Sequence, residues 1–199
     1  MSSKNLATRF RILETTLQML EEHRGHGVRM ADIAKRTGIS RQAIYLHFAS
    51  RTELLNATTK FLDERLDLDS RLAASRTASS GQERLALYVE FWGNYIPEIY
   101  SVAKALLLVL DTDAAAAAAW QERMAAMRDG CRTAVDILHS EGTLAPEWTQ
   151  ESATDTLWTM LSVANWENLT AECGWSTQQY VDRMKMITKR CLLKDESTL

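Results

Sequence analysis

The stretch ADIAKRTGISRQAIYLHF, residues 31–48, decides how the N-terminal part of the chain folds. Apolar residues recur at helical spacing on both sides of its RTGIS segment, which predicts two short helices, at about 30–36 and 40–47. Gly38 supplies the left-handed backbone that a tight helix-turn-helix corner needs. Ser40 is expected to cap the second helix by accepting a backbone N–H.

The second short helix is expected to begin with exposed polar side chains. Arg41, Gln42 and Tyr45 fall where a recognition helix carries the groups that read bases in the major groove. The Arg41 guanidinium suits guanine, and the Gln42 amide suits adenine. Tyr45, His47 and Arg51 can donate to phosphates beside the groove. The open alternative is a glycine-cornered helix pair that does not touch DNA, as many helical proteins contain.

The distribution of charge favours a nucleic-acid partner for this end of the chain. The net charge of the 199 residues is −3, but residues 1–60 hold ten Lys or Arg and only five Asp or Glu. Residues 61–199 hold thirteen basic and twenty-one acidic residues. A basic head on an acidic body is expected of a protein that points one end at phosphate.

The composition is that of a globular protein made almost entirely of helices. Hydrophobic residues make up 46% and charged residues 25%, and two prolines and eight glycines leave little to interrupt helix. About nine helices are expected, and the all-α prediction rests on their spacing of apolar residues. Their expected ranges are 6–20, 30–36, 40–47, 50–72, 85–96 (ended by Pro97), 99–110, 114–140, 149–173 and 176–193, with a loop at 74–83.

Neither a membrane span nor disulfide chemistry is expected. The longest apolar run, ALLLVL at 105–110, is too short to cross a bilayer, and the N-terminus has no apolar signal core, so a cytoplasmic location is expected. Cys131, Cys173 and Cys191 form no CxxC pair and are expected to be buried thiols.

The segment MADIAKRTGISRQAIYLHFASRTELL, residues 30–55, resembles the signature of the TetR family of one-component transcription regulators. The likeness covers roughly residues 5–60 and includes the tight corner, the Y-x-H-F end of the recognition helix and the serine that opens the next helix. It implies a helix-turn-helix domain at 1–50 and a helical effector-binding and dimerisation domain at 51–199, bridged by the fourth helix. Arg51 stands for the more usual lysine and Arg29 for a frequent threonine. By resemblance the DNA contacts are Arg29, Ser40, Arg41, Gln42, Tyr45, His47 and Arg51.

The resemblance also implies a homodimer built by the last two long helices. The segment ANWENLTAECGWSTQQYVDRM, residues 164–184, resembles a subtype of the family's C-terminal domain. The alternative is that the apolar stripes on these helices only fill the core of a single chain. The residues expected at the dimer interface are Leu157, Leu161, Ala164, Asn168, Val181, Met184 and Ile187.

A small apolar or aromatic effector is expected to bind in the body. Large aromatic and sulfur side chains on its helices line ligand cavities, but they also fill ordinary cores. The six alanines Ala114–Ala119 favour helix but leave one wall of the bundle without large side chains. Either a neighbouring helix packs closely against this wall, or the space beside it is a cavity. The residues expected at the pocket are Trp92, Tyr95, Trp120, Met124, Met127 and Trp158.

The sequence gives no support for an enzyme. The four histidines show no metal-ligand spacing, and there is no nucleophile elbow or glycine-rich phosphate loop, so neither a metal nor a cofactor is expected. The favoured interpretation is a homodimeric transcription regulator that binds palindromic double-stranded operator DNA and acts as a repressor released by its small-molecule effector. The alternative is a helical interaction or scaffold protein without sequence-specific DNA binding.

Overall fold

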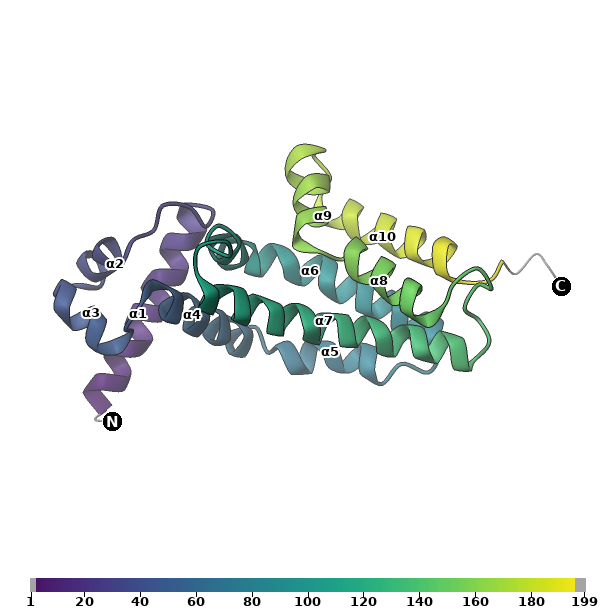
Figure 1. Ribbon diagram of the computed structural model, residues 1–199, viewed down its shortest axis with the longest axis horizontal. Helices are drawn as coiled ribbons and strands as arrows, with labels where there is room; N and C mark the ends of the chain where they lie inside the picture. Colours follow the sequence, from purple (N-terminus) through teal and green to yellow (C-terminus); the bar gives the residue numbers. More distant parts are fainter. Residues whose placement is uncertain (1–2, 196–199) are drawn as a thin grey trace. The chain divides into compact units, whose positions relative to one another are not determined.

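The computed structural model describes residues 3–195 and contains no β-strand within them; an isolated bridge pairs Leu144 with Leu193. The all-α prediction is confirmed, with ten α-helices and one π-helical turn in the described residues in place of about nine helices (Figure 1). The elements are α1 Ser3–Glu22, α2 Met30–Thr37, α3 Arg41–His47, α4 Arg51–Arg65, α5 Leu68–Arg76, α6 Gly81–Leu107, α7 Ala114–Ser140, α8 Gln150–Met160, α9 Val163–Glu167, η1 Asn168–Glu172 and α10 Thr177–Leu192.

The chain divides into two compact units. Unit 1 comprises the residues up to Leu66 together with Ile99–Glu122, and unit 2 comprises Asp67–Glu98 and the residues from Arg123 onward. The long helices α6 and α7 each supply residues to both units. The division at residue 50 that the sequence suggests remains a prediction.

Unit 1 holds the N-terminal helices around a small apolar core. Helix α1 packs against α2 and α4, and α2 packs against α3. The aromatic ring of Phe48, directly after α3, is fully buried. Burial of these side chains, rather than helix propensity, stabilises helices as short as α2 and α3. Other fully buried core residues of unit 1 are Ile12, Leu20, Ile44 and Leu54.

Helix α1 ends at a glycine that touches its neighbour. The Gly25 backbone is left-handed, with φ of 81°, and its N–H donates to the Leu20 carbonyl at 2.8 Å. A Cβ at Gly25 would lie 2.5 Å from the Ser101 carbonyl oxygen of α6. Gly27 also has a positive φ, 69°, but the space around it is open.

Helix α6 continues through Pro97, so the expectation that proline ends a helix there is wrong. Proline removes a single N–H donor, the one that would bond to the Gly93 carbonyl one turn earlier. Tyr95 and Ile96 before the proline, and Ile99 after it, are buried. Packing on both sides therefore outweighs the missing hydrogen bond. The division between the two units falls at Glu98–Ile99, directly after this position.

The single helix expected at 50–72 is divided into two helices, α4 and α5, in the structure. Helix α4 ends at Arg65, and Asp67, with a left-handed φ of 50°, separates it from α5. Ser50 caps α4 by accepting the Glu53 N–H at 3.0 Å, as predicted. The Glu53 carboxylate accepts from the Ala49 N–H at 2.7 Å, one residue before the cap. Helix α5 extends to Arg76 and occupies part of the stretch expected to be a loop.

The single helix expected at 149–173 is divided into α8, α9 and η1. Ser162 caps a new helix by accepting the Asn165 N–H at 3.2 Å, while the Asn165 amide donates to the Met160 carbonyl at 2.6 Å. Side chains that bond to nearby backbone compete with the helical ladder in this way. The turn at η1 then closes through the Cys173 N–H on the Asn168 carbonyl.

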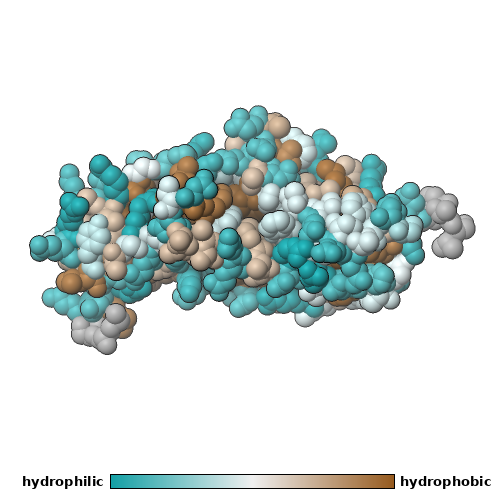
Figure 2. Space-filling model, viewed as in Figure 1, coloured by the Kyte–Doolittle hydropathy of each residue, from teal (hydrophilic) through white to brown (hydrophobic). Residues whose placement is uncertain are grey.

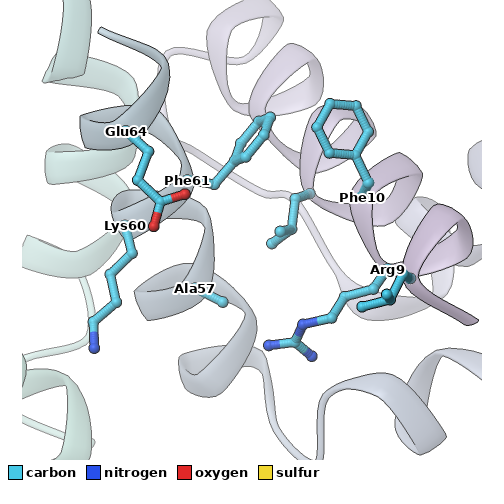
Figure 3. Close-up of a pocket in the computed structure, with 8 residues that line it drawn as sticks. Arg9, Phe10, Ala57, Lys60, Phe61 and Glu64 are labelled. Atoms are coloured by element: carbon cyan, nitrogen blue, oxygen red, sulfur yellow. The ribbon is translucent and has the colours of Figure 1, made fainter. Parts of the chain in front are cut away.

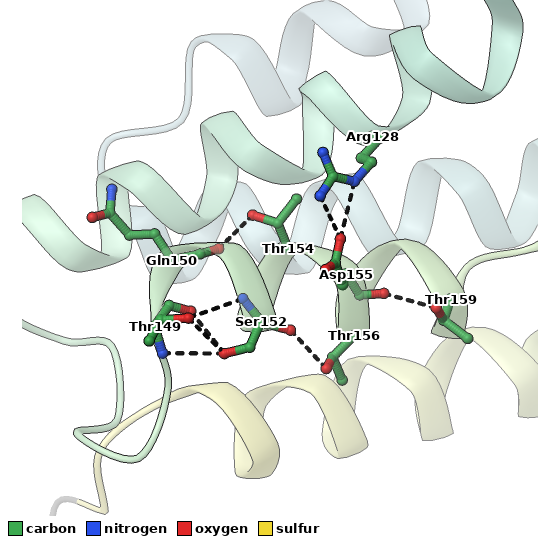
Figure 4. Close-up of polar contacts among 8 residues, drawn as sticks. All are labelled: Arg128, Thr149, Gln150, Ser152, Thr154, Asp155, Thr156 and Thr159. Atoms are coloured by element: carbon green, nitrogen blue, oxygen red, sulfur yellow. Dashed lines mark hydrogen bonds and ion pairs between the residues drawn. The ribbon is translucent and has the colours of Figure 1, made fainter. Parts of the chain in front are cut away.

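Helix α8 begins with a reciprocal cap. The Thr149 hydroxyl accepts the Ser152 N–H at 3.1 Å, and the Ser152 hydroxyl accepts the Thr149 N–H at 3.1 Å (Figure 4). On the same helix, the Asp155 carboxylate accepts from Arg128 Nε of α7 at 3.0 Å (Figure 4). This ion pair joins α7 and α8 within unit 2.

The face seen in Figure 2 is mostly hydrophilic, with small hydrophobic patches between polar side chains. None of the helices in residues 3–195 is long and apolar enough to cross a membrane. All three cysteines are free, and Cys131 is buried as expected. Cys173 is exposed and Cys191 is half-buried, so the expectation of three buried thiols is wrong for these two. Cys173 directly follows η1, and Cys191 lies in the last turn of α10.

Candidate nucleic-acid interface

The corner between α2 and α3 has the predicted geometry. Gly38 is left-handed, with φ of 74° and ψ of 32°, and the Ile39 N–H beyond it donates to the Ala34 carbonyl at 3.0 Å. The Ser40 hydroxyl then accepts the Ala43 N–H at 3.1 Å and starts α3. These bonds satisfy backbone groups that helix ends leave open, and they fix the direction in which α3 leaves the corner.

Helix α3 presents one buried and one exposed face. Ile44 is fully buried, whereas Arg41, Gln42 and Tyr45 are exposed. Leu46 is 88% exposed. Among residues 3–195 the Arg41 guanidinium has no hydrogen-bond or ion-pair partner, and its side chain is exposed to solvent. Two groups able to form bidentate contacts with base edges therefore stand free at the start of a rigid, capped helix.

The end of α3 is held by a residue that the sequence did not single out. Arg9 of α1 donates from Nη1 to the His47 carbonyl at 2.7 Å, and its guanidinium lies 4.1 Å from the Phe48 ring centroid. The His47 side chain is half-buried, and its Nδ1 has no hydrogen-bond partner among the described residues. Arg9 and His47 are 38 residues apart, so no local pattern pairs them.

Arg51, predicted to bind phosphate, is partly engaged within the chain. Its Nε donates to the Val28 carbonyl at 3.0 Å, in the segment that leads into α2. Partial burial lowers the pKa of its guanidinium. The side chain therefore joins the start of α4 to the start of α2, and only its remaining N–H groups are available for a ligand.

Arg29 stands at the cap position of α2 and is highly exposed. Its Nε lies 2.7 Å from the Asp32 carboxylate in the same first turn. The Arg29 hydrogen bond holds the pKa of Asp32 below its usual value and raises the pKa of the guanidinium. An exposed pair of this kind contributes little to stability, so phosphate can compete for Arg29 at small cost.

A hollow of about 320 Å³ lies between α1 and α4 (Figure 3). The Phe10 and Phe61 rings meet edge to face inside it, with centroids 5.1 Å apart. Phe10 is 52% exposed although it is aromatic. The lining residues are Leu6, Arg9, Phe10 and Leu13 of α1, with Ala57, Lys60, Phe61 and Glu64 of α4.

The residues predicted to line an effector pocket are divided between the units. Trp120 belongs to unit 1, and the other five belong to unit 2. The Trp92 and Tyr95 rings are in contact, with centroids 5.8 Å apart. Tyr95 is fully buried and Met127 is 4% exposed. Trp92, Met124 and Trp158 are half-buried. A common pocket remains a prediction.

The alanine run is mostly surface. Ala114, Ala115 and Ala118 are exposed, and Ala116 is fully buried. The run begins α7 and is capped by Asp113, whose carboxylate accepts the Ala115 and Ala116 N–H groups at 3.0 Å. Neither close packing nor a cavity therefore accounts for the run as a whole.

Four residues predicted at a dimer interface are buried inside the single chain. Leu157 and Leu161 are fully buried, and Val181 and Met184 are 4% and 2% exposed. They fill the core of unit 2, because their apolar stripe faces neighbouring helices of the same chain. Ala164 and Asn168 are exposed and Ile187 is half-exposed, so only these three remain available to a second copy.

The described residues contain no group of three or more His, Cys, Asp or Glu side chains that could hold a metal ion.

Comparison with known proteins places the helix-turn-helix region in a family. Residues 12–58 match the model of "Bacterial regulatory proteins, tetR family". A 66-residue segment is 36% identical to the nucleoid occlusion factor SlmA of Marinomonas sp. (strain MWYL1) and covers 33% of this chain. The matched segment spans only 34% of that relative's length.

Solved structures resemble the whole fold. A candidate transcriptional regulator from Saccharomonospora viridis, in complex with choline, has a TM-score of 0.79 at 19% identity, over 94% of this chain and 98% of that one. A candidate TetR-family regulator from Rhodococcus sp. has a TM-score of 0.71 at 18% identity, over 92% and 98%. Residues 12–58 thus match the tetR family of bacterial regulatory proteins, and along the rest of the chain the likeness to these solved regulators is one of fold.

Proposed function

We propose that the protein is a sequence-specific DNA-binding transcription regulator and that α3 enters the major groove. The observation that carries this proposal is the exposure of Arg41 and Gln42 at the start of a helix fixed by the Gly38 corner and the Ser40 cap. Arg41 reads a guanine through O6 and N7, and Gln42 reads an adenine through N6 and N7.

The remaining predicted contacts position the head on the duplex. Tyr45 donates its hydroxyl to a phosphate beside the groove, and the Ser40 backbone lies at the helix start where phosphates are favoured. Arg29 leaves Asp32 for phosphate, and Arg51 uses the N–H groups not bonded to Val28. His47 is a phosphate donor through the ring nitrogen other than its buried Nδ1.

The regulator acts as a homodimer on a palindromic operator. Two recognition helices related by a two-fold axis are about 34–36 Å apart, or a multiple of that, which requires a symmetric pair of half-sites. The interface uses exposed and half-exposed side chains of α9, η1 and α10, including Ala164, Asn168 and Ile187. Analytical ultracentrifugation of Ile187→Glu tests this: a dimer that persists undiminished contradicts the interface, and a monomer supports it.

A small apolar or aromatic effector binds in unit 2 and releases the repressor from DNA. The aromatic residues of α6 that include Trp92 and Tyr95 provide the surface, and the choline complex of the S. viridis protein supports a ligand in a regulator of this fold. The ligand acts through the difference in its affinity for the DNA-fitting and non-fitting states, typically about 1–3 kcal/mol. Trp92→Ala or Trp158→Ala should preserve operator affinity and blunt release.

A binding experiment separates this function from a scaffold role. The full-length protein is incubated with a random duplex library, bound DNA is amplified through several rounds, and the recovered sequence is measured against a scrambled duplex. Recovery of a palindrome that binds at least about a thousand-fold more tightly supports the proposal. Equal affinity for both duplexes would favour the helical scaffold protein instead. Arg41→Ala and Gln42→Ala should each cost about 1–3 kcal/mol on the recovered site.

A further inference from the structure

Leu46 is the most exposed large hydrophobic side chain among residues 3–195. It is 88% exposed, whereas Leu6, Phe10 and Leu108 are 53%, 52% and 52% exposed. It lies on α3, between the buried Ile44 and the buried Phe48, so it points away from the core of unit 1. A leucine in this state keeps almost all of its apolar surface in water, and removing that surface from water is favourable.

Leu46 shares a helix face with the predicted adenine reader. Gln42 and Leu46 are four residues apart, which places them on one side of α3, one turn apart. Their Cα atoms are separated by roughly 6 Å along the helix axis. If Gln42 meets a base edge, Leu46 therefore meets the groove within about two base pairs of it.

The major groove offers one apolar group that a leucine can contact. Guanine, cytosine and adenine present hydrogen-bonding atoms there, and thymine adds a C5 methyl. An isobutyl side chain has no donor or acceptor, so against any other base edge it would cover polar atoms and leave them unpaired. The thymine methyl is therefore the group that Leu46 can cover without such a penalty.

We propose that Leu46 is a specificity-determining residue that reads the C5 methyl of a thymine within about two base pairs of the base read by Gln42. This proposal rests on the proposed function, because it requires α3 to enter the major groove. It adds a requirement on the operator: each half-site contains a thymine whose methyl contributes to affinity through one identified side chain.

The test removes the methyl from the DNA and the isobutyl from the protein. Each thymine of the selected site is replaced singly by deoxyuridine, and binding of the full-length protein is measured by fluorescence anisotropy. At one thymine per half-site, deoxyuridine should weaken wild-type binding about four-fold, the value of one buried methyl group. Leu46→Ala should bind the thymine site more weakly than the wild type does. The ratio of its affinities for the thymine and deoxyuridine sites at that position should fall to about one.

Three controls isolate the contact. Leu46→Met should keep most of the methyl preference because it keeps an apolar side chain. Leu108→Ala, at a 52% exposed residue between α6 and α7, should keep the full wild-type ratio of affinities for the thymine and deoxyuridine sites. The thermal melt of Leu46→Ala should match that of the wild type, because an exposed side chain is being shortened.

Two results would overturn the proposal while leaving DNA recognition intact. One is that Leu46→Ala and the wild type show the same ratio of affinities for the thymine and deoxyuridine sites. The other is that no deoxyuridine substitution in the selected site weakens binding of the wild-type protein. Failure of the proposed function would appear earlier and separately, as a selection that recovers no preferred duplex, and it would overturn the role of Leu46 as well.

Discussion

Thr52, in the first turn of α4, donates a hydrogen bond to the Asp113 carboxylate, 61 residues further along the chain. The same carboxylate accepts the Ala115 and Ala116 N–H groups and so caps α7. One acidic side chain therefore joins the helix that follows the recognition helix to the start of a helix that continues into unit 2. This is a physical route by which the position of α7 can influence α4.

Asp113→Asn should reduce stability in a pH-dependent way. The Thr52 hydrogen bond, followed by that from the Ala116 N–H, lowers the pKa of Asp113 from the ordinary 3.8. A carboxyl whose folded pKa is depressed stabilises the fold fully above its unfolded pKa, and that stability is lost as pH falls through the folded value. Urea unfolding from about pH 6 toward pH 3 should show a wild-type advantage that shrinks below about pH 4.

Asp111→Asn is the matched control for this prediction. Asp111 is exposed in the same segment between α6 and α7, and its side chain has no hydrogen-bond partner among residues 3–195. Its variant should follow the wild type at every pH. An equal pH dependence in the Asp111 and Asp113 variants would show that the carboxylate of Asp113 is not the stabilising group.

Gly25→Ala should destabilise the protein more than Gly27→Ala. Both glycines have a left-handed φ, so each alanine adds about 1–2 kcal/mol of backbone strain. Only the Gly25 variant also places a Cβ 2.5 Å from the Ser101 carbonyl oxygen, which should add about 1–3 kcal/mol. The free energies of unfolding of the two variants check this; equal losses would mean that α6 does not press on the end of α1.

Replacing each of the two prolines with alanine should change the stability of the fold in opposite directions. Pro97 lies inside α6, and Pro97→Ala restores a helical N–H donor, so it should stabilise the fold by about 2 kcal/mol. Pro146 follows Ala145 in a turn closed by the Trp148 N–H on the Ala145 carbonyl, where proline is favoured. Pro146→Ala should cost about 0.4–1 kcal/mol. Differential scanning calorimetry of both variants checks this. A change in melting temperature of the same sign in both would contradict a continuous α6.

Arg9→Ala should weaken DNA binding although Arg9 is not a predicted base reader. It removes the donor to the His47 carbonyl and the cation above the Phe48 ring, and so loosens the end of α3. A loss of about 1–3 kcal/mol in stability is expected from the unpaired carbonyl. Arg11→Ala, an exposed position on α1, is the control. Unchanged melting and operator affinity in Arg9→Ala would remove Arg9 from this role.

The local features of the head could be read from the sequence because they depend on residues close together in the chain. Gly38, Ser40 and Ser50 act within four residues of their partners, and the structure has their turn and caps as predicted. The contacts of Arg9 and Thr52 span 38 and 61 residues, and no spacing rule connects such positions.

The body was harder to predict because packing overrides local signals there. Pro97 should end a helix by its own chemistry, yet buried neighbours carry α6 through it. Ser162 and Asn165 break a segment that contains neither glycine nor proline. An apolar stripe also looks the same whether it faces the chain's own core or a second copy; Leu157 and Met184, predicted at an interface, are buried within the single chain.

The central claim is that the exposed start of α3 reads DNA sequence. The direct measurement is the affinity of wild type, Arg41→Ala and Gln42→Ala for the selected duplex and for variants changed at one base pair at a time. Each alanine variant should lose about 1–3 kcal/mol on the selected site and become indifferent to the base at one position per half-site, a different position for each. Loss of affinity by the same factor on every duplex, with base preference unchanged, would contradict the claim.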